Sequence, residues 1–183
     1  MSDGQPKDAL IVVDVQRGFE EPFWGKRNNP GCEENIAKLI GAWRSKGDPI
    51  VFVRHDSLEP DSPLAPGSKG NDFKDVISGQ PDLLVRKNVH SAFYGNPDLH
   101  AWLQERGIDR VTICGITTNH CCETTVRMGA DLGYGVRFVL DATHTFDMTA
   151  PDGSVVSAET LTSATAAGLH EEFAQVVSTR EIA

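Results

Sequence analysis

The sequence predicts an α/β protein in which a mostly parallel sheet carries helices on both faces. Short apolar runs alternate along the chain with longer segments of helical periodicity, and the runs are apolar at nearly every position. Residues 8–14 are one such run, which is typical of a strand buried on both faces of its sheet. Strands that alternate with helices are typical of parallel pairing.

The first half of the chain supplies three strands and one helix. After the first strand, residues 33–46 contain four apolar side chains at helical spacing, and Gly47 is typical of the residue that follows a helix. Strands are expected at residues 49–54 and 82–86. Between them, residues 55–81 are rich in Pro, Gly, Asp and Ser and form an unusually long connection. Such a loop is either a functional lid or a plain surface insertion.

The second half repeats the alternation. Pro97 is expected at the first position of a helix whose apolar face contains Trp102. Ser157 is expected to cap a later helix. The remaining elements, in chain order, are a strand at 111–114, a helix at 119–132, a strand at 136–140, a helix at 157–173 and a strand at 174–178.

The length and composition indicate one globular domain, residues 1–183, with neither nucleic acid nor a membrane as a partner. Lys and Arg number 17 against 26 Asp and Glu, so the net charge is −9, and no basic stripe exists to attract nucleic acid or an anionic membrane. No apolar run approaches the roughly 18 residues that span a bilayer. Residues 1–7 are polar and lack the apolar core of a signal peptide, so we expect a cytoplasmic protein.

Cys121 is the most informative of the four cysteines. It lies between a predicted strand and a predicted helix, where free backbone N–H groups and the helix dipole stabilise a thiolate and can hold an oxyanion. The alternative is a buried cysteine that serves only as a small apolar residue. The four cysteines show neither CxxC nor zinc-finger spacing, so free thiols are expected.

Three reactive residues are expected at one edge of the sheet. Asp14 ends the first strand, Lys87 follows the third, and Cys121 follows the fourth, and ligands of such sheets bind at the carboxyl ends of the strands. Taken singly, Asp14 could cap a turn and Lys87 could be a solvated loop residue. Together they match a nucleophile with its activators, with Asp14 as base toward Cys121 and Lys87 as the supporting cation.

Three segments resemble the motifs of one family, the isochorismatase-like cysteine hydrolases. Residues 115–125, Gly-Ile-Thr-Thr-Asn-His-Cys-Cys-Glu-Thr-Thr, are similar to its nucleophile motif. Residues 10–16 resemble its first-strand motif, with Phe19 at the matching aromatic position, and residues 87–93 resemble its lysine motif. The motifs occur in the family's order, and the resemblance covers nearly the whole chain.

The resemblance implies a three-layer α/β/α sandwich around a six-stranded sheet, and a triad of Asp14, Lys87 and Cys121. It also implies a cis peptide bond between Ile116 and Thr117, which directs the N–H groups of Thr117 and Cys121 toward an oxyanion. Most members cleave a C–N bond of a small amide, ureide or carbamoyl compound through a thioester. The family further implies a homo-oligomer, and no cofactor is expected.

Several residues beside the motifs are candidates for substrate binding. Phe19 and Phe93 adjoin triad motifs, and Asn119 and His120 precede the nucleophile, although Asn119 could instead cap the helix. Further candidates for apolar walls, with core packing as the alternative, are Trp24, Tyr94 and Phe146. Arg54 and Arg86 could bind a carboxylate, but pairing with local acids is the commoner role of an arginine.

Two departures from the family pattern affect the prediction. The residue after the nucleophile is often Val in relatives, and here it is Cys122, which we interpret as a packing residue. The nicotinamidase branch binds a metal through an Asp and several His near the end of the second strand. Here that region is Arg54-His55-Asp56, with no other His before His90, so neither a metal site nor nicotinamidase activity is expected.

The leading hypothesis is therefore a cysteine amidohydrolase, and three alternatives remain. A vinyl-ether hydrolase of the isochorismatase type does not depend on a cysteine nucleophile. A non-catalytic binding protein on the same fold would leave Cys121 with an ordinary thiol pKa. A thiol-redox protein would use Cys121 and Cys122, although the absence of CxxC spacing argues against it.

Overall fold

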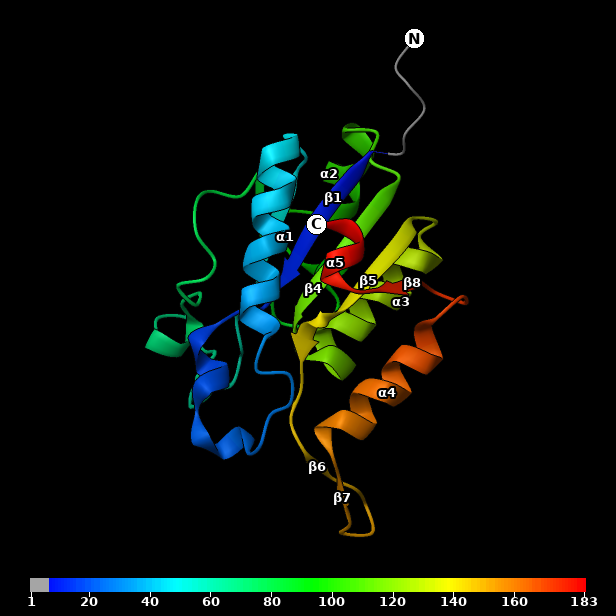
Figure 1. Cartoon of the computed structure of the whole chain (residues 1–183). Helices are drawn as coiled ribbons and strands as arrows, with labels where there is room; N and C mark the ends of the chain where they lie inside the picture. The colour runs from blue at the N-terminus through cyan, green and yellow to red at the C-terminus, as the bar shows by residue number, and fades with distance from the viewer. Residues whose placement is uncertain (1–6) are drawn as a thin grey trace.

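The predicted parallel sheet is present in the computed structural model, which describes residues 7–183 (Figure 1). Six parallel strands form one sheet in the order β3-β2-β1-β4-β5-β8. Their bounds are β1 Asp8–Val13, β2 Ile50–His55, β3 Leu83–Lys87, β4 Arg110–Ile116, β5 Gly135–His144 and β8 Gln175–Val177. Two short strands, β6 (Met148–Thr149) and β7 (Val155–Val156), pair separately as an antiparallel hairpin. The expectation about residues 1–7 lies, except for residue 7, outside the described residues.

Helices cover both faces of the sheet, which confirms the predicted α/β/α sandwich (Figure 1). One face carries α1 (Cys32–Lys46) and α5 (Thr179–Ile182). The other carries α2 (Leu99–Glu105), α3 (Glu123–Asp131) and α4 (Ala158–Leu169). None of the helices described between residues 7 and 183 has both the length and the apolar composition needed to cross a membrane.

The central strand β1 divides the core into two halves. All six of its residues are buried, and successive side chains point to opposite faces. Leu10 and Val12 pack toward α1, whereas Ile11 and Val13 pack toward the face of α2 and α3. Each fully buried side chain of this size contributes about 1.5–3 kcal/mol, so β1 anchors the sheet from which the candidate site is built.

The boundaries of several elements differ from the prediction. Pro97 does not begin a helix: its bond to Asn96 is cis, and Asp98 caps α2 by accepting a hydrogen bond from the Ala101 N–H at 3.0 Å. The helix predicted at residues 119–132 consists of a π-helical turn, Thr118–Cys122, followed by α3. The helix predicted to reach residue 173 ends at Leu169, although Ser157 caps its start as predicted.

Strand β5 extends four residues beyond the predicted segment at 136–140. The added residues include Thr143 and His144, which pair with Gly115 and Ile116 of β4. Their polar side chains give no apolar run, so the sequence pattern stops at Leu140. The extension matters because it brings Thr143 and His144 to the carboxyl edge of the sheet, where the predicted reactive residues lie.

Candidate active site

Asp14, Lys87 and Cys121 meet at the carboxyl edge of the sheet, as their positions predict. The Lys87 Nζ donates to Asp14 Oδ2 at 2.6 Å and to Cys121 Sγ at 3.3 Å. The exposed fractions of these residues are 0% for Asp14, 3% for Lys87 and 7% for Cys121. Asp14 has a φ of 50°, a left-handed conformation that non-glycine residues rarely adopt, and its N–H donates to Val53 O.

The protonation states follow from burial and from the neighbouring charges. Burial lowers the pKa of the Lys87 ammonium, but Asp14 and Cys121 raise it by more, so Lys87 remains charged. Burial raises the pKa of the Cys121 thiol, Asp14 raises it further, and Lys87 only partly opposes them. The expectation of a thiolate at rest is therefore wrong, because the loss of hydration outweighs the attraction of the ammonium. The resting site holds a thiol beside an ion pair.

One oxygen of Asp14 is free to accept a proton. Oδ2 is bound by Lys87, whereas Oδ1 is buried without a hydrogen-bond partner among the described residues. A carboxylate oxygen of Asp14 and the sulfur of Cys121 lie within 4.8 Å of each other. A buried carboxylate oxygen with no donor is costly, which favours transfer of a proton to it.

Side chains of α3 and β5 hold the nucleophile turn. Thr125 Oγ1 donates to the Cys121 carbonyl at 2.6 Å, and Thr118 Oγ1 donates to Thr143 Oγ1 at 2.8 Å. Just before this turn, the peptide bond between Ile116 and Thr117 is cis, as the resemblance implies. The sulfur is therefore presented from a segment that is fixed at both ends.

A small cavity opens above Cys121. Its volume is about 130 Å³, below the roughly 300 Å³ at which pockets for drug-sized ligands begin. Its lining comprises Phe19, Trp24, His55, Leu64, His90, Thr117, His120 and Cys121. Burial lowers the pKa of His55, and Lys87 lowers it further; burial and His90 lower the pKa of His120. Both rings are therefore neutral near pH 7, and the cavity combines mainly apolar walls with uncharged imidazole groups.

Two of the four predicted substrate contacts line this cavity, Phe19 and His120, and two do not. Phe93 lies in the core, where its ring stacks on Tyr134 at 5.8 Å between centroids. Asn119 Oδ1 accepts a hydrogen bond from Thr145 Oγ1 at 2.5 Å, and its Nδ2 donates to Met148 Sδ. Proximity in sequence to a motif placed Phe93 and Asn119 near the site, but neither is among the residues that line the cavity.

Some of the other candidates for the cavity wall lie at the cavity, and others do not. Trp24 lines the cavity, and Phe146 stacks on it at 5.6 Å. Tyr94 is 70% exposed and lies outside this lining. Arg54 and Arg86 both contact Asp56, at 3.4 Å and 2.6 Å, instead of facing the cavity.

Sequence reasoning assigned no place in the cavity to His90, Leu64 or the side chain of Thr117. The Thr117 hydroxyl is buried and has no hydrogen-bond partner among the described residues. Leu64 comes from the long loop at residues 55–81, which therefore shapes the cavity. Threonines and leucines are too common in loops to indicate such roles. The unusual length of the loop at residues 55–81 did indicate a possible functional role for that segment.

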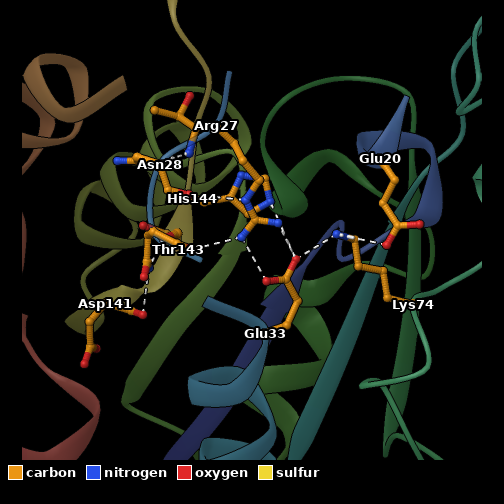
Figure 2. Close-up of polar contacts among 10 residues, drawn as sticks. Glu20, Arg27, Asn28, Glu33, Lys74, Asp141, Thr143 and His144 are labelled. Carbon is orange, nitrogen blue, oxygen red and sulfur yellow. Dashed lines mark hydrogen bonds and ion pairs between the residues drawn. The ribbon is translucent and has the colours of Figure 1, made fainter. Parts of the chain in front are cut away.

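A partly buried ionic cluster of Arg27, Glu33 and Lys74 lies beside His144 (Figure 2). Glu33 accepts hydrogen bonds from Arg27 at 2.7 and 2.9 Å and from Lys74 at 2.7 Å. Burial raises the pKa of Glu33, but these hydrogen bonds lower it to about 2. His144 is fully buried beside Glu33, and its ring packs edge-on against Phe146 at 5.3 Å. The cluster is thus connected to the cavity wall through His144 and Phe146, because Phe146 packs on Trp24.

Metal-ligating atoms also gather at the site. Within the described part of the chain, one group of three, Asp14, His55 and Cys121, has ligand atoms within 4.8 Å of one another. The Lys87 ammonium already contacts all three, at 2.6, 3.2 and 3.3 Å. A divalent cation there would meet a like charge, so these residues fit an ammonium better than a metal ion.

Comparisons with known proteins bear on the same site. A family model described as the Isochorismatase domain matches residues 8–180. The uncharacterized isochorismatase family protein YrdC of Bacillus subtilis is 36% identical over 179 residues, covering 97% of this chain and 95% of its own. Nicotinamidase 3 of Arabidopsis thaliana is 31% identical over 153 residues, covering 76% and 74%. A crystal structure of an isochorismatase-family hydrolase from Chromobacterium violaceum has a TM-score of 0.92 at 34% identity, covering 100% of this chain and 94% of that one.

The opposing effects of Asp14 and Lys87 on the thiol pKa predict opposite shifts in reactivity. Because Asp14 raises the Cys121 pKa and Lys87 lowers it, Asp14→Asn should begin to react with iodoacetamide at lower pH than the wild type, and Lys87→Met at higher pH. Mass spectrometry would map the alkylation to each cysteine, with the fully buried Cys122 as an internal control for folding. Shifts in the same direction would contradict this electrostatic account.

The buried His144 predicts a specific dependence of stability on pH. Burial lowers the pKa of the folded His144 to about 3, helped by Arg27 and Lys74, from the value of 6.5 expected in the unfolded chain. Between these two pH values, the unfolded chain binds a proton at His144 and the folded chain does not. Stability is full above the unfolded pKa and falls as the pH drops. Between ~pH 7 and ~pH 5, the free energy of unfolding should fall about 2 kcal/mol less in His144→Phe than in the wild type.

Denaturant unfolding at both pH values would measure this difference. His170→Phe is the matched control, because the His170 side chain is 52% exposed. Parallel pH profiles for the wild type and His144→Phe would show that His144 is not kept neutral by the fold.

Proposed function

This chain belongs to the isochorismatase family of hydrolases, and we propose that it cleaves the C–N bond of a small amide, ureide or carbamoyl compound. The observation that supports the proposal most strongly is the contact of the Lys87 ammonium with both Asp14 and Cys121. The name of the Arabidopsis relative, nicotinamidase, denotes cleavage of an amide and agrees with this reaction class.

The first step is a proton transfer followed by nucleophilic attack. The Cys121 thiol gives its proton to Asp14 Oδ1, and the sulfur attacks the carbonyl carbon of the substrate. The net charge of Asp14, Lys87 and Cys121 together does not change, because the negative charge only moves from one neighbour of Lys87 to another. The N–H groups of Thr117 and Cys121 are the proposed donors to the resulting oxyanion.

The remaining steps return the site to its resting state. The tetrahedral intermediate collapses, the C–N bond breaks, and the proton on Asp14 passes to the departing nitrogen. The acyl group is then a thioester of Cys121. Asp14 takes a proton from water as the water oxygen attacks the thioester carbon. The C–S bond breaks, Asp14 returns the proton to the sulfur of Cys121, and the carboxylic acid is released.

The cavity favours an uncharged substrate over an anionic one. Its volume of about 130 Å³ suits a small molecule, and no Arg or Lys lines it among the described residues. Arg54 and Arg86, the sequence candidates for a carboxylate site, are held by Asp56 instead. Isochorismate carries two carboxylates, which such a site would leave without cationic partners. The vinyl-ether alternative is therefore less well supported.

A panel of small amides, ureides and carbamoyl compounds, assayed by release of ammonia, tests the proposal. Cys121→Ala and Asp14→Asn should each lower kcat by at least about 1,000-fold, because they remove the nucleophile and its base. Cys32→Ala, a buried cysteine on the opposite face of the sheet, is the control for general effects of removing a thiol. Retention of most activity by Cys121→Ala would contradict the thioester mechanism and favour ether hydrolysis.

A further inference from the structure

We infer that His55 binds the substrate through an Nε2–H donor whose position is fixed because the Lys87 ammonium locks the other ring nitrogen as an acceptor. The partner on the substrate is an uncharged acceptor atom, most simply the carbonyl oxygen of a small amide or ureide. The inference rests on the proposed function and specifies which protein group recognises the substrate.

The Lys87 ammonium fixes the tautomer of His55 because it can donate hydrogen bonds but cannot accept them. The Lys87 Nζ lies 3.2 Å from His55 Nδ1, and an ammonium group has three donors and no acceptor. The other two donors are directed at Asp14 and Cys121, so the third meets the lone pair of Nδ1. Nδ1 must therefore be unprotonated, and a neutral imidazole then carries its hydrogen on Nε2. The lowered pKa of His55, which arises from burial and from Lys87, agrees with a neutral ring.

The backbone of His55 is held as firmly as its ring. The Gln16 Oε1 accepts from the His55 N–H at 2.8 Å, and Gln16 Nε2 donates back to the His55 carbonyl at 3.0 Å. Asn71 Nδ2 donates to the same carbonyl at 3.0 Å. Gln16 is 0% exposed and Asn71 is 4% exposed, so these contacts are shielded from water. A donor fixed in this way loses little conformational entropy on binding.

The surroundings of His55 define the chemistry that it can recognise. His55 lines the same small cavity as Cys121 and Thr117. A neutral N–H donor beside the sulfur complements the uncharged carbonyl oxygen of an amide. A carboxylate would accept from the same donor, but it would lie close to the negative charge of Asp14.

The first test observes the tautomer directly and requires no activity. In protein labelled with ¹⁵N at histidine, the His55 resonances, assigned with His55→Gln, should show a protonated Nε2 and a bare Nδ1 at neutral pH. Lys87→Met should release the lock and give a mixture of tautomers. A protonated Nδ1 in the folded wild type would overturn the inference.

The second test uses two probes of nearly equal size. Iodoacetamide is a neutral amide and iodoacetate its anionic counterpart, and both alkylate Cys121 without any hydrolysis. Relative to a free thiol in solution, Cys121 should prefer iodoacetamide. His55→Leu should raise the iodoacetamide concentration that gives half the maximal rate of alkylation about 10-fold, because the carbonyl loses its donor. His55→Gln, which retains a distal N–H, should stay within about threefold of the wild type.

The outcomes separate this inference from the proposed function. Equal half-maximal concentrations for the wild type and His55→Leu, or a preference for iodoacetate, would overturn the role of His55 even if amides are hydrolysed. A fixed tautomer and selective alkylation without hydrolysis of any amide in the panel would instead retain the binding role and contradict the proposed reaction. Circular dichroism of each variant excludes unfolding as the cause.

Discussion

The buried contact between Lys87 and Asp14 is the interaction on which the rest of the site depends. Two opposite charges at 2.6 Å and 0% side-chain exposure compensate each other, whereas either alone would be strongly unfavourable in this environment. In the proposed mechanism, the pair lets a proton move from Cys121 to Asp14 without creating a new isolated charge. The arrangement of charges is then neutral before and after the proton moves.

The sheet topology explains how four strands supply these groups. In the strand order β3-β2-β1-β4, Lys87, His55, Asp14 and Cys121 come from the ends of adjacent strands or from the turns that follow them. His55 pairs in register with Lys87, and its strand β2 lies between β3, which carries Lys87, and β1, which precedes Asp14. Parallel strands place all four at one edge, which is the general position of ligand sites in such sheets (Figure 1). The same register that builds the core therefore also builds the candidate site.

The sequence predicted the parts of this protein that depend on strong local patterns. Apolar strands, helical periodicity and the positions of Asp14, Lys87 and Cys121 relative to strand ends are all visible in the chain. The protonation state of Cys121 could not be predicted from the sequence, because burial is a property of the whole fold. The side-chain partners of Phe93 and Asn119 could not be predicted for a related reason, since the direction of a side chain depends on tertiary neighbours such as Tyr134 and Thr145.

Partition of a common intermediate tests the proposed thioester most directly. Two substrates that share an acyl group but differ in the departing amine would be hydrolysed in the presence of hydroxylamine, and the ratio of hydroxamate to acid would be measured for each. The account predicts the same ratio for both, because both pass through one acyl thioester on Cys121. Ratios that depend on the departing amine, or turnover that yields no hydroxamate, would contradict an acyl thioester that persists after the amine has left. Either result would also contradict the assignment of Cys121 as the nucleophile.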